Sequence, residues 1–477
     1  MSVSLPLDTC PLRYQAIKDP THSAFLWDGH ALSYALIDHW VNDICLAMAK
    51  QGIQTNDRLM LLNGNALDTC LLIIACLRTD VLFCPVNPSF PEDQITQYAL
   101  NASINWLCSP ATLSERLLQY CNHFVLPEKN HNVQRPNTLI KINPNALLTV
   151  VATSGSTGTP KAIAHSYKNH FFNAVGSQSA LPLKPEDSWL VSLPLFHVGG
   201  IAIIFRCLLA GATLIAFSKH QPLAETLTSY RISHLSLVNT QLYRLLIHEK
   251  MHLGNTGLRY ILLGGGIASQ PLVETAQNQG LVVLTTYGMT EMGSQVCTDK
   301  PVFSQYGMTS GSLLPYCDIK IADHDEIYVR GKPLAQGILH KGELQTVTDA
   351  SGWYHTGDRG KWLNNQILVT GRTDNLFISG GENIQPEEIE RALLLFPTVI
   401  QAVVVPYLNV EFGQRPVAYL KTTDSLINVD ALKQHLSHHI ARFKVPDKFL
   451  PFPDTSQSLG IKVNRQKFKF LAQQINR

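Results

Sequence analysis

The stretch RLMLLNGNALDTCLLIIACLRTDVLFC, residues 58–84, decides the fold class. Its opening, Arg58-Leu-Met-Leu-Leu62, is a short apolar run that ends at the turn Asn63-Gly-Asn65, which is typical of a buried strand. Residues 66–79 are apolar over a length that favours a buried helix, and Val81-Leu-Phe-Cys84 is a second short apolar run. A strand, a helix and a strand in this order indicate a parallel sheet, so we predict an α/β fold.

Similar apolar runs occur further along the chain, and each leads into a polar or glycine-rich loop. The predicted strands and the loops after them are Ala146–Ala152 with Thr153–Lys161, Tyr260–Leu263 with Gly264–Gly266, and Leu281–Leu284 with Thr285–Glu291. Parallel sheets bind ligands at the loops that follow the carboxyl ends of their strands. We therefore expect these loops to converge on one crevice.

The pattern of predicted elements changes after about residue 310, where short runs typical of β-strands replace the alternation of strands and helices. Beyond Arg372 the pattern indicates a small α+β unit, with a helix that starts at Pro386, strands at 399–405 and 416–420, and a helix capped by Asp430 that ends at Ile440. We predict a large domain at residues 1–372, of parallel-rich α/β sheets plus a β-barrel-like part. A small α+β domain would occupy residues 373–477.

Composition limits the classes of partner. The 477 residues include 38 Lys and Arg against 36 Asp and Glu, so the formal net charge of +2 provides no broad basic field for nucleic acid or an anionic membrane. The strongest apolar run, Leu71–Leu77, is too short to span a bilayer, and the first residues lack the pattern of a signal peptide. Ten cysteines without a C-x-x-C pair indicate buried thiols in a reducing compartment, so we expect a cytoplasmic protein. The sequence leaves open whether the chain forms a homo-oligomer.

The loop TSGSTGTPK, Thr153–Lys161, has a composition that suits a phosphate. It is not a Walker loop, because the second glycine position counted from Gly155 is Pro160 and the residue after the lysine is Ala162, which has no hydroxyl for a metal. What remains is a loop whose hydroxyls and amides can hold a polyphosphate. Its candidate nucleotide-binding residues are Thr153, Ser154, Gly155, Ser156, Thr157, Gly158 and Lys161.

This loop and several later motifs together resemble the adenylate-forming superfamily, which contains acyl-CoA and aryl-CoA synthetases, peptide-synthetase adenylation domains and luciferases. The later motifs follow the family's order over nearly the whole chain: Tyr287-Gly-Met-Thr-Glu291, Tyr354-His-Thr-Gly-Asp358, Gly371-Arg-Thr-Asp374, Ser379-Gly-Gly-Glu-Asn383 and Lys462-Val-Asn-Arg465. The resemblance implies an acid-thiol ligase that uses ATP, Mg²⁺ and coenzyme A and works through an acyl-adenylate. It also implies that the small C-terminal domain is mobile.

The resemblance gives roles to residues around the nucleotide. Glu291 would hold Mg²⁺, a hard cation that prefers carboxylate oxygen, and Thr290 would hydrogen-bond the α-phosphate. Tyr287 would enclose adenine together with the loop of Gly264, Gly265 and Gly266, since glycine permits close backbone approach.

Further implied roles fall later in the chain. Asp358 matches the acid that accepts hydrogen bonds from both ribose hydroxyls, and Arg372 would contact the same ribose or a phosphate. Asp374 matches the hinge about which the small domain turns, and Gly380 with Gly381 would line a tunnel for coenzyme A. The alternatives are a surface salt bridge for Arg372 and a solvated loop acid for Asp374.

The resemblance also implies two catalytic side chains. Lys462 would enter the site from the C-terminal domain and stabilise the charge that develops as a carboxylate attacks the α-phosphate. The family usually has glycine directly before this lysine, where this chain has Ile461, but the Lys-x-x-Arg spacing is kept. His197 would lie beside the acyl group and turn at the thioester step, and its alternative is a satisfied core histidine.

Within the superfamily, the chain most resembles the 2-succinylbenzoate-CoA ligases of menaquinone biosynthesis. This resemblance rests on residues 371–390, with Gln385 where fatty acyl-CoA synthetases usually carry tyrosine, and on Phe412-Gly-Gln-Arg-Pro-Val417 and Asn239-Thr-Gln-Leu-Tyr-Arg244. A ligase for another aryl or medium-chain acid, a carrier-linked adenylation domain and a nucleotide-binding relative without catalysis stay open as alternatives.

The implied substrate is an aromatic dicarboxylate, with one carboxylate to activate and one to hold. The held carboxylate needs an arginine or several donors in an otherwise apolar pocket. Arg244 and Arg206 are the candidates, because each stands in an apolar stretch where an unpaired charge would be costly. Ser294 and Gln295 could donate instead.

Overall fold

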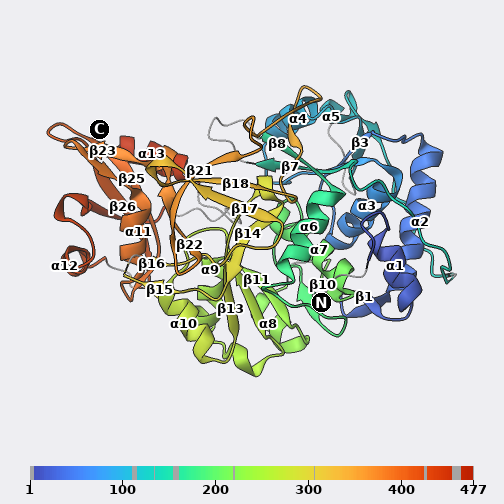
Figure 1. The fold of residues 1–477 in the computed structure, drawn as a ribbon, viewed down its shortest axis with the longest axis horizontal. Coiled ribbons are helices and arrows are strands. Elements are labelled where there is room, and N and C mark those ends of the chain that lie inside the picture. The colour runs from blue at the N-terminus through green and yellow to red at the C-terminus, as the bar shows by residue number, and fades with distance from the viewer. Residues whose placement is uncertain are drawn as a thin grey trace.

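A computed structural model describes residues 5–109, 115–133, 135–153, 161–218, 221–305, 307–423, 427–453 and 464–475. Within these residues, two eight-stranded sheets and a four-stranded sheet form a large body, and a three-stranded sheet lies in a smaller part formed by the C-terminal residues (Figure 1). The predicted α/β fold class is therefore confirmed.

The first eight-stranded sheet is built around the strand-helix-strand unit at residues 58–84. Its order is β20 (Glu343–Gln345), β19 (Gly337–His340), β8 (Lys161–Ser166), β7 (Leu147–Thr153), β4 (Leu82–Pro85), β3 (Arg58–Leu61), β5 (Trp106–Cys108) and β6 (Asn122–His123). The helices that lie between its strands in the chain are α3 (Ala66–Thr79), α4 (Glu92–Asn101) and α5 (Glu115–Leu118), and α2 (Tyr34–Gln51) precedes β3 and packs against α3. Strands β3 and β4 pair in parallel, and Asn65 caps the helix between them by accepting a hydrogen bond from the Asp68 amide at 2.8 Å, as its residue type favours.

The second eight-stranded sheet carries the remaining predicted parallel strands. Its order is β14 (Ser294–Asp299), β13 (Val282–Met289), β12 (Tyr260–Leu263), β11 (His234–Leu237), β9 (Ser188–Leu190), β10 (Thr213–Ala216), β1 (Ser23–Trp27) and β2 (His30–Ser33). Its helices are α1 (Pro11–Lys18), α6 (Tyr167–Ser177), α7 (Val198–Ala210), α8 (Leu223–Ser229), α9 (Asn239–Tyr243) and α10 (Gln270–Asn278), with short helical turns η1 (Arg244–His248), η2 (Leu253–Asn255) and η3 (Thr290–Met292). One hydrophobic core joins α3 and α7 to strands of both sheets, so the two sheets share an interior.

The loop Thr153–Lys161 joins two antiparallel strands, because β7 pairs with β8 and places Thr153 opposite Lys161. The loop thus follows the carboxyl end of a strand that is parallel to β4 on one side and antiparallel to β8 on the other. It belongs to the first sheet, and the other two loops belong to the second. The third loop is shorter than predicted, since β13 continues to Met289.

The rest of the large body is an antiparallel sheet of β17 (Cys317–Ile321), β18 (Glu326–Gly331), β21 (Tyr354–Leu363) and β22 (Gln366–Arg372). This sheet occupies the part of the chain for which the sequence predicts a barrel-like structure. The small elements in or next to the same part of the chain are β15 (Phe303–Ser304), β16 (Gly307–Met308) and η4 (Asp323–Asp325).

The C-terminal part begins after β22. Its elements are η5 (Thr373–Asn375), β23 (Phe377–Ser379), β24 (Glu382–Ile384), α11 (Pro386–Leu394), β25 (Val399–Asn409), β26 (Gly413–Thr422), α12 (Val429–Ser437), η6 (Arg442–Lys444), β27 (Lys448–Pro451) and α13 (Arg465–Gln473). The prediction that Asp430 caps α12 is wrong, because Asn428 accepts the capping hydrogen bond from the Ala431 amide at 3.1 Å. The helix ends at Ser437 and does not reach Ile440.

Candidate active site

The motifs at residues 287–291 and 354–358 are joined by two hydrogen bonds. In each bond the tyrosine of one motif donates to the acid of the other. Tyr287, on β13, donates its hydroxyl to Asp358 Oδ2 at 2.8 Å. Tyr354, on β21, donates to Glu291 Oε1 at 2.9 Å. Burial raises the pKa of both phenols, so each stays protonated and remains a donor at neutral pH. The second sheet and the antiparallel sheet are therefore linked at the two carboxylates that the sequence predicts to bind ribose and metal.

Asp358 also accepts a hydrogen bond from Arg372, whose Nη1 lies 2.9 Å from Asp358 Oδ1. The Nε of the same arginine donates to Asp374 Oδ1 at 2.9 Å. Arg372 thus lies between the acid predicted for ribose and the acid predicted for the hinge, and Asp374 is paired rather than solvated alone. The pair is exposed, with 46% of the Arg372 side chain and 51% of the Asp374 side chain accessible.

The hairpin of β13 and β14 is also fixed to the first sheet. His165, on β8, is fully buried, and its Nε2 lies 2.8 Å from the carbonyl oxygen of Thr290. A carbonyl can only accept, so the Nε2–H of His165 donates this bond. The carbonyl of Glu291 accepts from the Ala335 amide at 2.7 Å. Thr290 and Glu291 are therefore held by their backbone, which leaves their side chains for other partners.

The strand that carries His165 starts at Lys161, the last residue of the predicted phosphate loop. Lys161 is exposed, and Thr153 faces it across the β7–β8 ladder. Five predicted phosphate-binding residues, Ser154, Gly155, Ser156, Thr157 and Gly158, lie outside the described residues. Lys462 also lies outside them.

The glycine loop after β12 has two local requirements. A Cβ on Gly264 would lie 2.8 Å from Cγ2 of Thr286, so the close approach of β12 to β13 excludes a side chain there. Gly265 has φ +86°, a conformation that L-residues rarely adopt. Gly266 has open space around it, and both Gly265 and Gly266 are exposed. The loop therefore presents backbone rather than side chains.

Arg206 is a buried arginine that has no acidic partner among the described residues. Its side chain lies on α7, is 2% exposed, and stacks over Trp189 with 5.3 Å between Cζ and the ring centroid. Nη2 lies 3.5 Å from the hydroxyl oxygen of Ser294, and Nε has no hydrogen-bond partner. Burial lowers the pKa of this guanidinium to about 10, so it is still charged at neutral pH. A buried cation without an anion is costly, and the arrangement suits an anionic ligand.

Arg244 differs from Arg206 in its environment. The prediction that it lies in an apolar interior is wrong, because its side chain is exposed while the neighbouring Leu245 and Leu246 are buried. His197 is half-buried at the N-terminus of α7, in edge contact with Phe196. A Cβ on Gly200 would lie 2.4 Å from the Pro194 carbonyl oxygen, so the segment before α7 packs closely on the first turn of the helix.

Gly380 and Gly381 form the exposed turn of the β23–β24 hairpin, with φ +56° and +86°. A Cβ on Gly380 would lie 2.9 Å from the ring of Phe412. This turn belongs to the small C-terminal part.

Glu291 fits a magnesium ion that is bound mainly through phosphate oxygens. Its Oε1 accepts from Tyr354, while Oε2 has no hydrogen-bond partner among the described residues. The described part of the chain contains no group of three or more His, Cys, Asp or Glu side chains that could hold a metal. Mg²⁺ commonly uses one or two carboxylates together with substrate phosphates, so a single carboxylate is a suitable ligand set.

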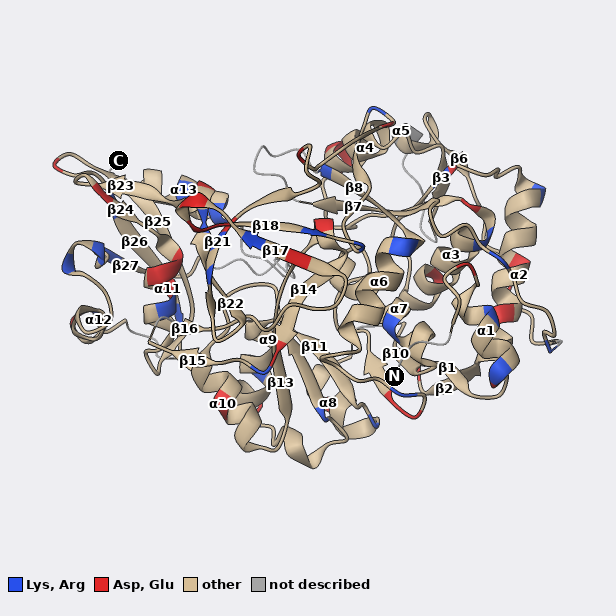
Figure 2. Cartoon of the chain, viewed as in Figure 1, with Lys and Arg blue, Asp and Glu red and all other residues tan. Residues whose placement is uncertain are grey.

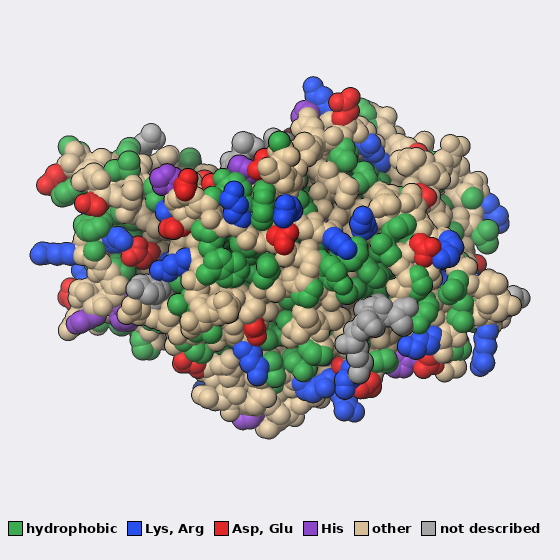
Figure 3. Space-filling model, in the orientation of Figure 1, with side chains coloured by type: hydrophobic (Ala, Val, Ile, Leu, Met, Phe, Trp, Pro, Cys, Tyr) green, Lys and Arg blue, Asp and Glu red, His purple; other side chains and the backbone are tan. Residues whose placement is uncertain are grey.

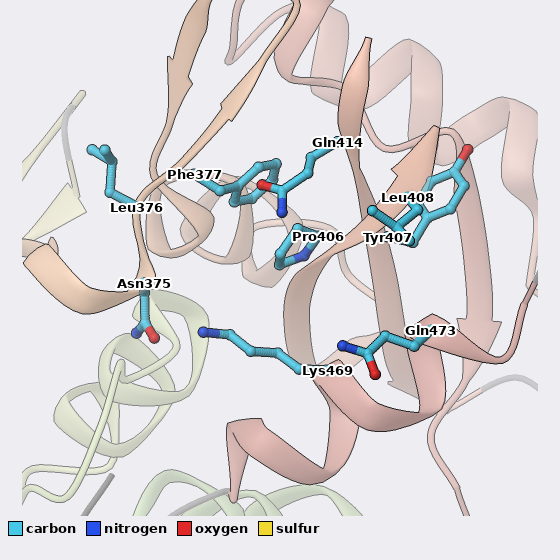
Figure 4. Close-up of a pocket in the computed structure, with 9 residues that line it drawn as sticks. All are labelled: Asn375, Leu376, Phe377, Pro406, Tyr407, Leu408, Gln414, Lys469 and Gln473. Atoms are coloured by element: carbon cyan, nitrogen blue, oxygen red, sulfur yellow. The ribbon is translucent and has the colours of Figure 1, made fainter. Parts of the chain in front are cut away.

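A cavity of about 340 Å³ lies elsewhere, in the small C-terminal part (Figure 4). Phe377, Pro406 and Leu408 provide its apolar wall, and Lys469 reaches from α13 toward Asn375. None of its lining residues is a predicted site residue. The cavity is therefore separate from the Asp358 and Glu291 carboxylates.

Several residues that contact predicted site residues or the 290–295 turn have no role in the sequence interpretation. Tyr354 stands in a motif that the sequence singles out, so its position could have indicated a role. Trp189, under Arg206, and Asn173, which contacts the hairpin turn, lie in segments without any motif. Only the tertiary structure places them.

Charge on the surface is mixed: Lys, Arg, Asp and Glu are interspersed over the elements, and the face in Figure 3 shows both signs between apolar patches (Figures 2 and 3). Among the described helices, none has both the length and the hydropathy needed to cross a bilayer. The ten cysteines are all free, and nine of them are buried, as the sequence predicts.

The sequence pattern described as AMP-binding enzyme matches residues 12–340. The chain belongs to the AMP-binding enzyme family. Among curated members of this family, the 2-succinylbenzoate-CoA ligase of Escherichia coli strain K12 is 35% identical over 430 residues, which cover 90% of each chain.

Two solved structures of another AMP-binding enzyme, the o-succinylbenzoate CoA synthetase (MenE) of Bacillus subtilis, are also similar. Its complex with the acyl-adenylate intermediate OSB-AMP has a TM-score of 0.85 at 26% identity, covering 97% of this chain and 98% of that one. A double variant bound to the product analogue OSB-NCoA has the same identity and coverage but a TM-score of 0.70. The TM-score of this chain is thus higher against the acyl-adenylate complex than against the product-analogue complex.

Proposed function

We propose that the protein is a 2-succinylbenzoate-CoA ligase of menaquinone biosynthesis. It would convert 2-succinylbenzoate, ATP and coenzyme A into 2-succinylbenzoyl-CoA, AMP and pyrophosphate. The observation that carries the choice of substrate is Arg206, a buried guanidinium without an acidic partner among the described residues, over Trp189. An aromatic dicarboxylate would provide the missing anion and an apolar body for the same pocket. The similarity to the Escherichia coli and Bacillus subtilis enzymes supports this choice.

In the first half-reaction, the free carboxylate of the acid attacks the α-phosphorus of ATP, and the bond to the β-phosphate breaks to release pyrophosphate. Glu291 would hold Mg²⁺, which neutralises phosphate charge when bound. Asp358 would accept from the ribose hydroxyls, oriented by Tyr287 and Arg372. Arg206 and Ser294 would hold the second carboxylate, which fixes the distance from the pocket to the reacting carboxyl group.

In the second half-reaction, the thiol of coenzyme A attacks the acyl carbon, the bond from that carbon to the phosphate oxygen breaks, and AMP leaves. We propose that residues 373–477 turn about Asp374 between the two steps, withdrawing Lys462 and bringing Gly380 and Gly381 to the site. The ten free thiols support a cytoplasmic location. Because both reactants are held in place, no covalent enzyme intermediate is needed.

The test is pyrophosphate release from a panel of acids: 2-succinylbenzoate, each of its two monomethyl esters, benzoate and medium-chain fatty acids. We expect 2-succinylbenzoate to have the highest kcat/KM. Loss of one charge-assisted interaction costs about 2–3 kcal/mol, on the order of 100-fold, so the monoester that keeps the reacting carboxylate free and the Arg206→Met variant should each lose about this much. Equal rates with benzoate and 2-succinylbenzoate would rule out the assigned substrate.

The two candidate arginines provide a direct comparison. Arg244→Met removes an exposed guanidinium, so its effect on the KM for the acid should be far smaller than that of Arg206→Met. An inactive nucleotide-binding relative would release no pyrophosphate with any acid. In a catalyst, Lys462→Ala should abolish pyrophosphate release while MgATP binding, measured by calorimetry, stays close to that of the unmodified protein.

A further inference from the structure

The turn between β13 and β14 has an unusual backbone. Gly293 has φ +63° and is followed by Ser294 with φ +137°, a conformation that a residue with a side chain rarely adopts. Gly288 packs against the same place, since a Cβ there would lie 1.7 Å from the Ser294 carbonyl oxygen. Strained residues of this kind persist only where the surrounding structure holds them.

Asn173, which lies outside the hairpin, stabilises this turn by hydrogen bonds. It lies on α6, is 3% exposed, and its side-chain amide donates to two backbone carbonyls, Met292 O at 3.1 Å and Gln295 O at 2.9 Å. These carbonyls flank Gly293 and Ser294, so one amide group spans the turn that contains the strained Ser294. The Oδ1 atom of Asn173 is buried and accepts no hydrogen bond, so the side chain acts at this turn only as a double donor.

We call the two hydrogen bonds from Asn173 to the Met292 and Gln295 carbonyls the Asn173 clamp. The residues before and after it in the chain have different proposed partners. Before it are Thr290 and Glu291, which face the phosphates and the metal in the proposed function. After it is Ser294, whose hydroxyl contacts Arg206 in the proposed acid pocket. The turn is therefore the shortest covalent path between the nucleotide side and the acid side of the site.

We propose that Asn173 is a positioning residue that sets the spacing between the nucleotide-binding and acid-binding halves of the site through the 290–295 turn. It contacts neither substrate in this proposal. It acts by fixing the position of Glu291 relative to Ser294. The proposal rests on the proposed function for the use of Glu291 and Arg206, but it does not depend on which acid is activated.

Asn173→Ala removes both donors and lets the turn relax, so both halves of the site should be affected together. We expect the Kd for MgATP, measured by calorimetry without any acid, and the KM for the acid, measured by pyrophosphate release, each to rise roughly 10-fold. A residue that only stabilises the fold would lower the active fraction and the melting temperature but leave both constants unchanged. The proposal is overturned if either constant stays within twofold of the unmodified protein.

Asn173→Asp gives a second readout in case the alanine variant folds poorly. An ionised carboxylate would face two carbonyl oxygens, whereas the protonated form can donate to one of them. The activity of Asn173→Asp relative to the unmodified protein should therefore rise as the pH falls from 8 to 6, while that of Asn173→Ala should stay constant. A flat profile for Asn173→Asp contradicts the clamp.

Gln15 offers a matched control for stability. It is 5% exposed on α1, and its amide donates to the carbonyls of Leu208 and Leu209 at 3.1 and 3.4 Å, at the far end of α7. Gln15→Ala should lower the melting temperature about as much as Asn173→Ala and leave both constants within twofold. If the unmodified protein rejects 2-succinylbenzoate, the MgATP measurement still tests the clamp, so failure of the substrate assignment and failure of the clamp are distinguishable.

Discussion

His165 keeps a neutral imidazole inside the protein, where it ties the first sheet to the hairpin of the second. Burial lowers its pKa to about 4, and the pKa of the neighbouring His170 is also well below its usual value because of burial. The rings of the two histidines lie 5.2 Å apart, so a proton on either ring would disfavour a proton on the other. The contact between the two sheets therefore depends on two uncharged rings.

This burial predicts acid sensitivity. In the unfolded chain a histidine titrates near pH 6.5, so the unfolded state takes up a proton as the pH falls below this value while folded His165 stays neutral. The stability from the neutral ring is fully present above about pH 6.5 and is lost progressively toward pH 4. Between pH 7.5 and 5, His165 should contribute a loss of roughly 2 kcal/mol in the free energy of unfolding, measured with urea. His165→Gln keeps a donor to Thr290 without a titrating group, so its free energy should fall less, and an unchanged pH dependence would contradict this account.

Tyr354 predicts an effect on metal use. Tyr354→Phe removes the donor to Glu291 Oε1, so the carboxylate loses its orientation. We expect the Mg²⁺ concentration for half-maximal pyrophosphate release to rise roughly 10-fold, because a hydrogen bond to a charged group is worth about 1.5 kcal/mol or more. Tyr328→Phe is the control, because Tyr328 makes a similar bond of 3.4 Å to Glu326 away from the site. Equal Mg²⁺ requirements in the two variants would exclude an orienting role for Tyr354.

At this scale the sequence predicts residues whose chemistry is local to a motif. Glu291 and Asp358 could be found because each stands in a short polar motif. Asn173 could not be found, since its role depends on carbonyls more than a hundred residues away. Arg244 was misjudged because an apolar neighbourhood in sequence does not tell which face of a helix a residue occupies, and its face is the exposed one.

The β13–β14 hairpin is the element that holds the site together. Its ladder shifts register between Tyr287 and Gly288, which places Gly288 opposite Gln295. A bulge of this kind bends a strand and re-aims the side chains beside it. Here Tyr287 points to Asp358, and Thr290 and Glu291 follow in the turn.

The close packing of Gly288 in the hairpin predicts that a side chain at this position lowers the free energy of unfolding. Gly288→Ala would place a Cβ 1.7 Å from the Ser294 carbonyl oxygen, so the strand pairing must change, and we expect a loss of more than about 3 kcal/mol in the free energy of unfolding. Gly280→Ala is the control, since Gly280 has φ +87° but no atom lies within 4 Å of the position that its new methyl group would take. It should cost only about 1–2 kcal/mol, the usual cost of a left-handed residue. Similar losses in both variants, measured by urea unfolding, would contradict the close packing of Gly288.

Elements with a clear apolar period could be predicted closely, as α3 and β12 were, because burial alone determines their length. Ends that depend on a capping side chain were less certain. Both Asn428 and Asp430 are suitable caps by residue type, and only the geometry decides for Asn428. The antiparallel pairing of β7 with β8 could not be predicted from the sequence, because a short loop rich in glycine is compatible with a hairpin as well as with a phosphate site.

Among the described residues, a small set of polar contacts crosses the predicted domain boundary. Arg391 donates to the carbonyls of Val369 and Thr370, and Gln385 donates to the carbonyl of Arg372. The exposed Arg372–Asp374 pair lies on the connecting segment itself.

Asp374 therefore predicts unequal effects on the two half-reactions. Asp374→Ala releases Arg372 from the proposed hinge residue, so the present arrangement loses one exposed ion pair and pyrophosphate release should slow roughly 2- to 5-fold. Thioester formation from preformed acyl-adenylate and coenzyme A should slow less. Asp318→Ala, which breaks the exposed pair with Arg330 within the large body, is the control and should leave both rates unchanged. Equal slowing of both half-reactions by Asp374→Ala would argue against the hinge.

The burial of the thiols has a chemical consequence for an enzyme that generates an activated acyl group. Cys207 is adjacent to Arg206, and burial raises its pKa, as it does for Cys70 and Cys76. Only the thiolate is a good nucleophile, so these cysteines stay protonated and unreactive at neutral pH. The interior thus protects the protein from acylating itself, and the thiol brought by coenzyme A is left as the acceptor that can compete for the adenylate.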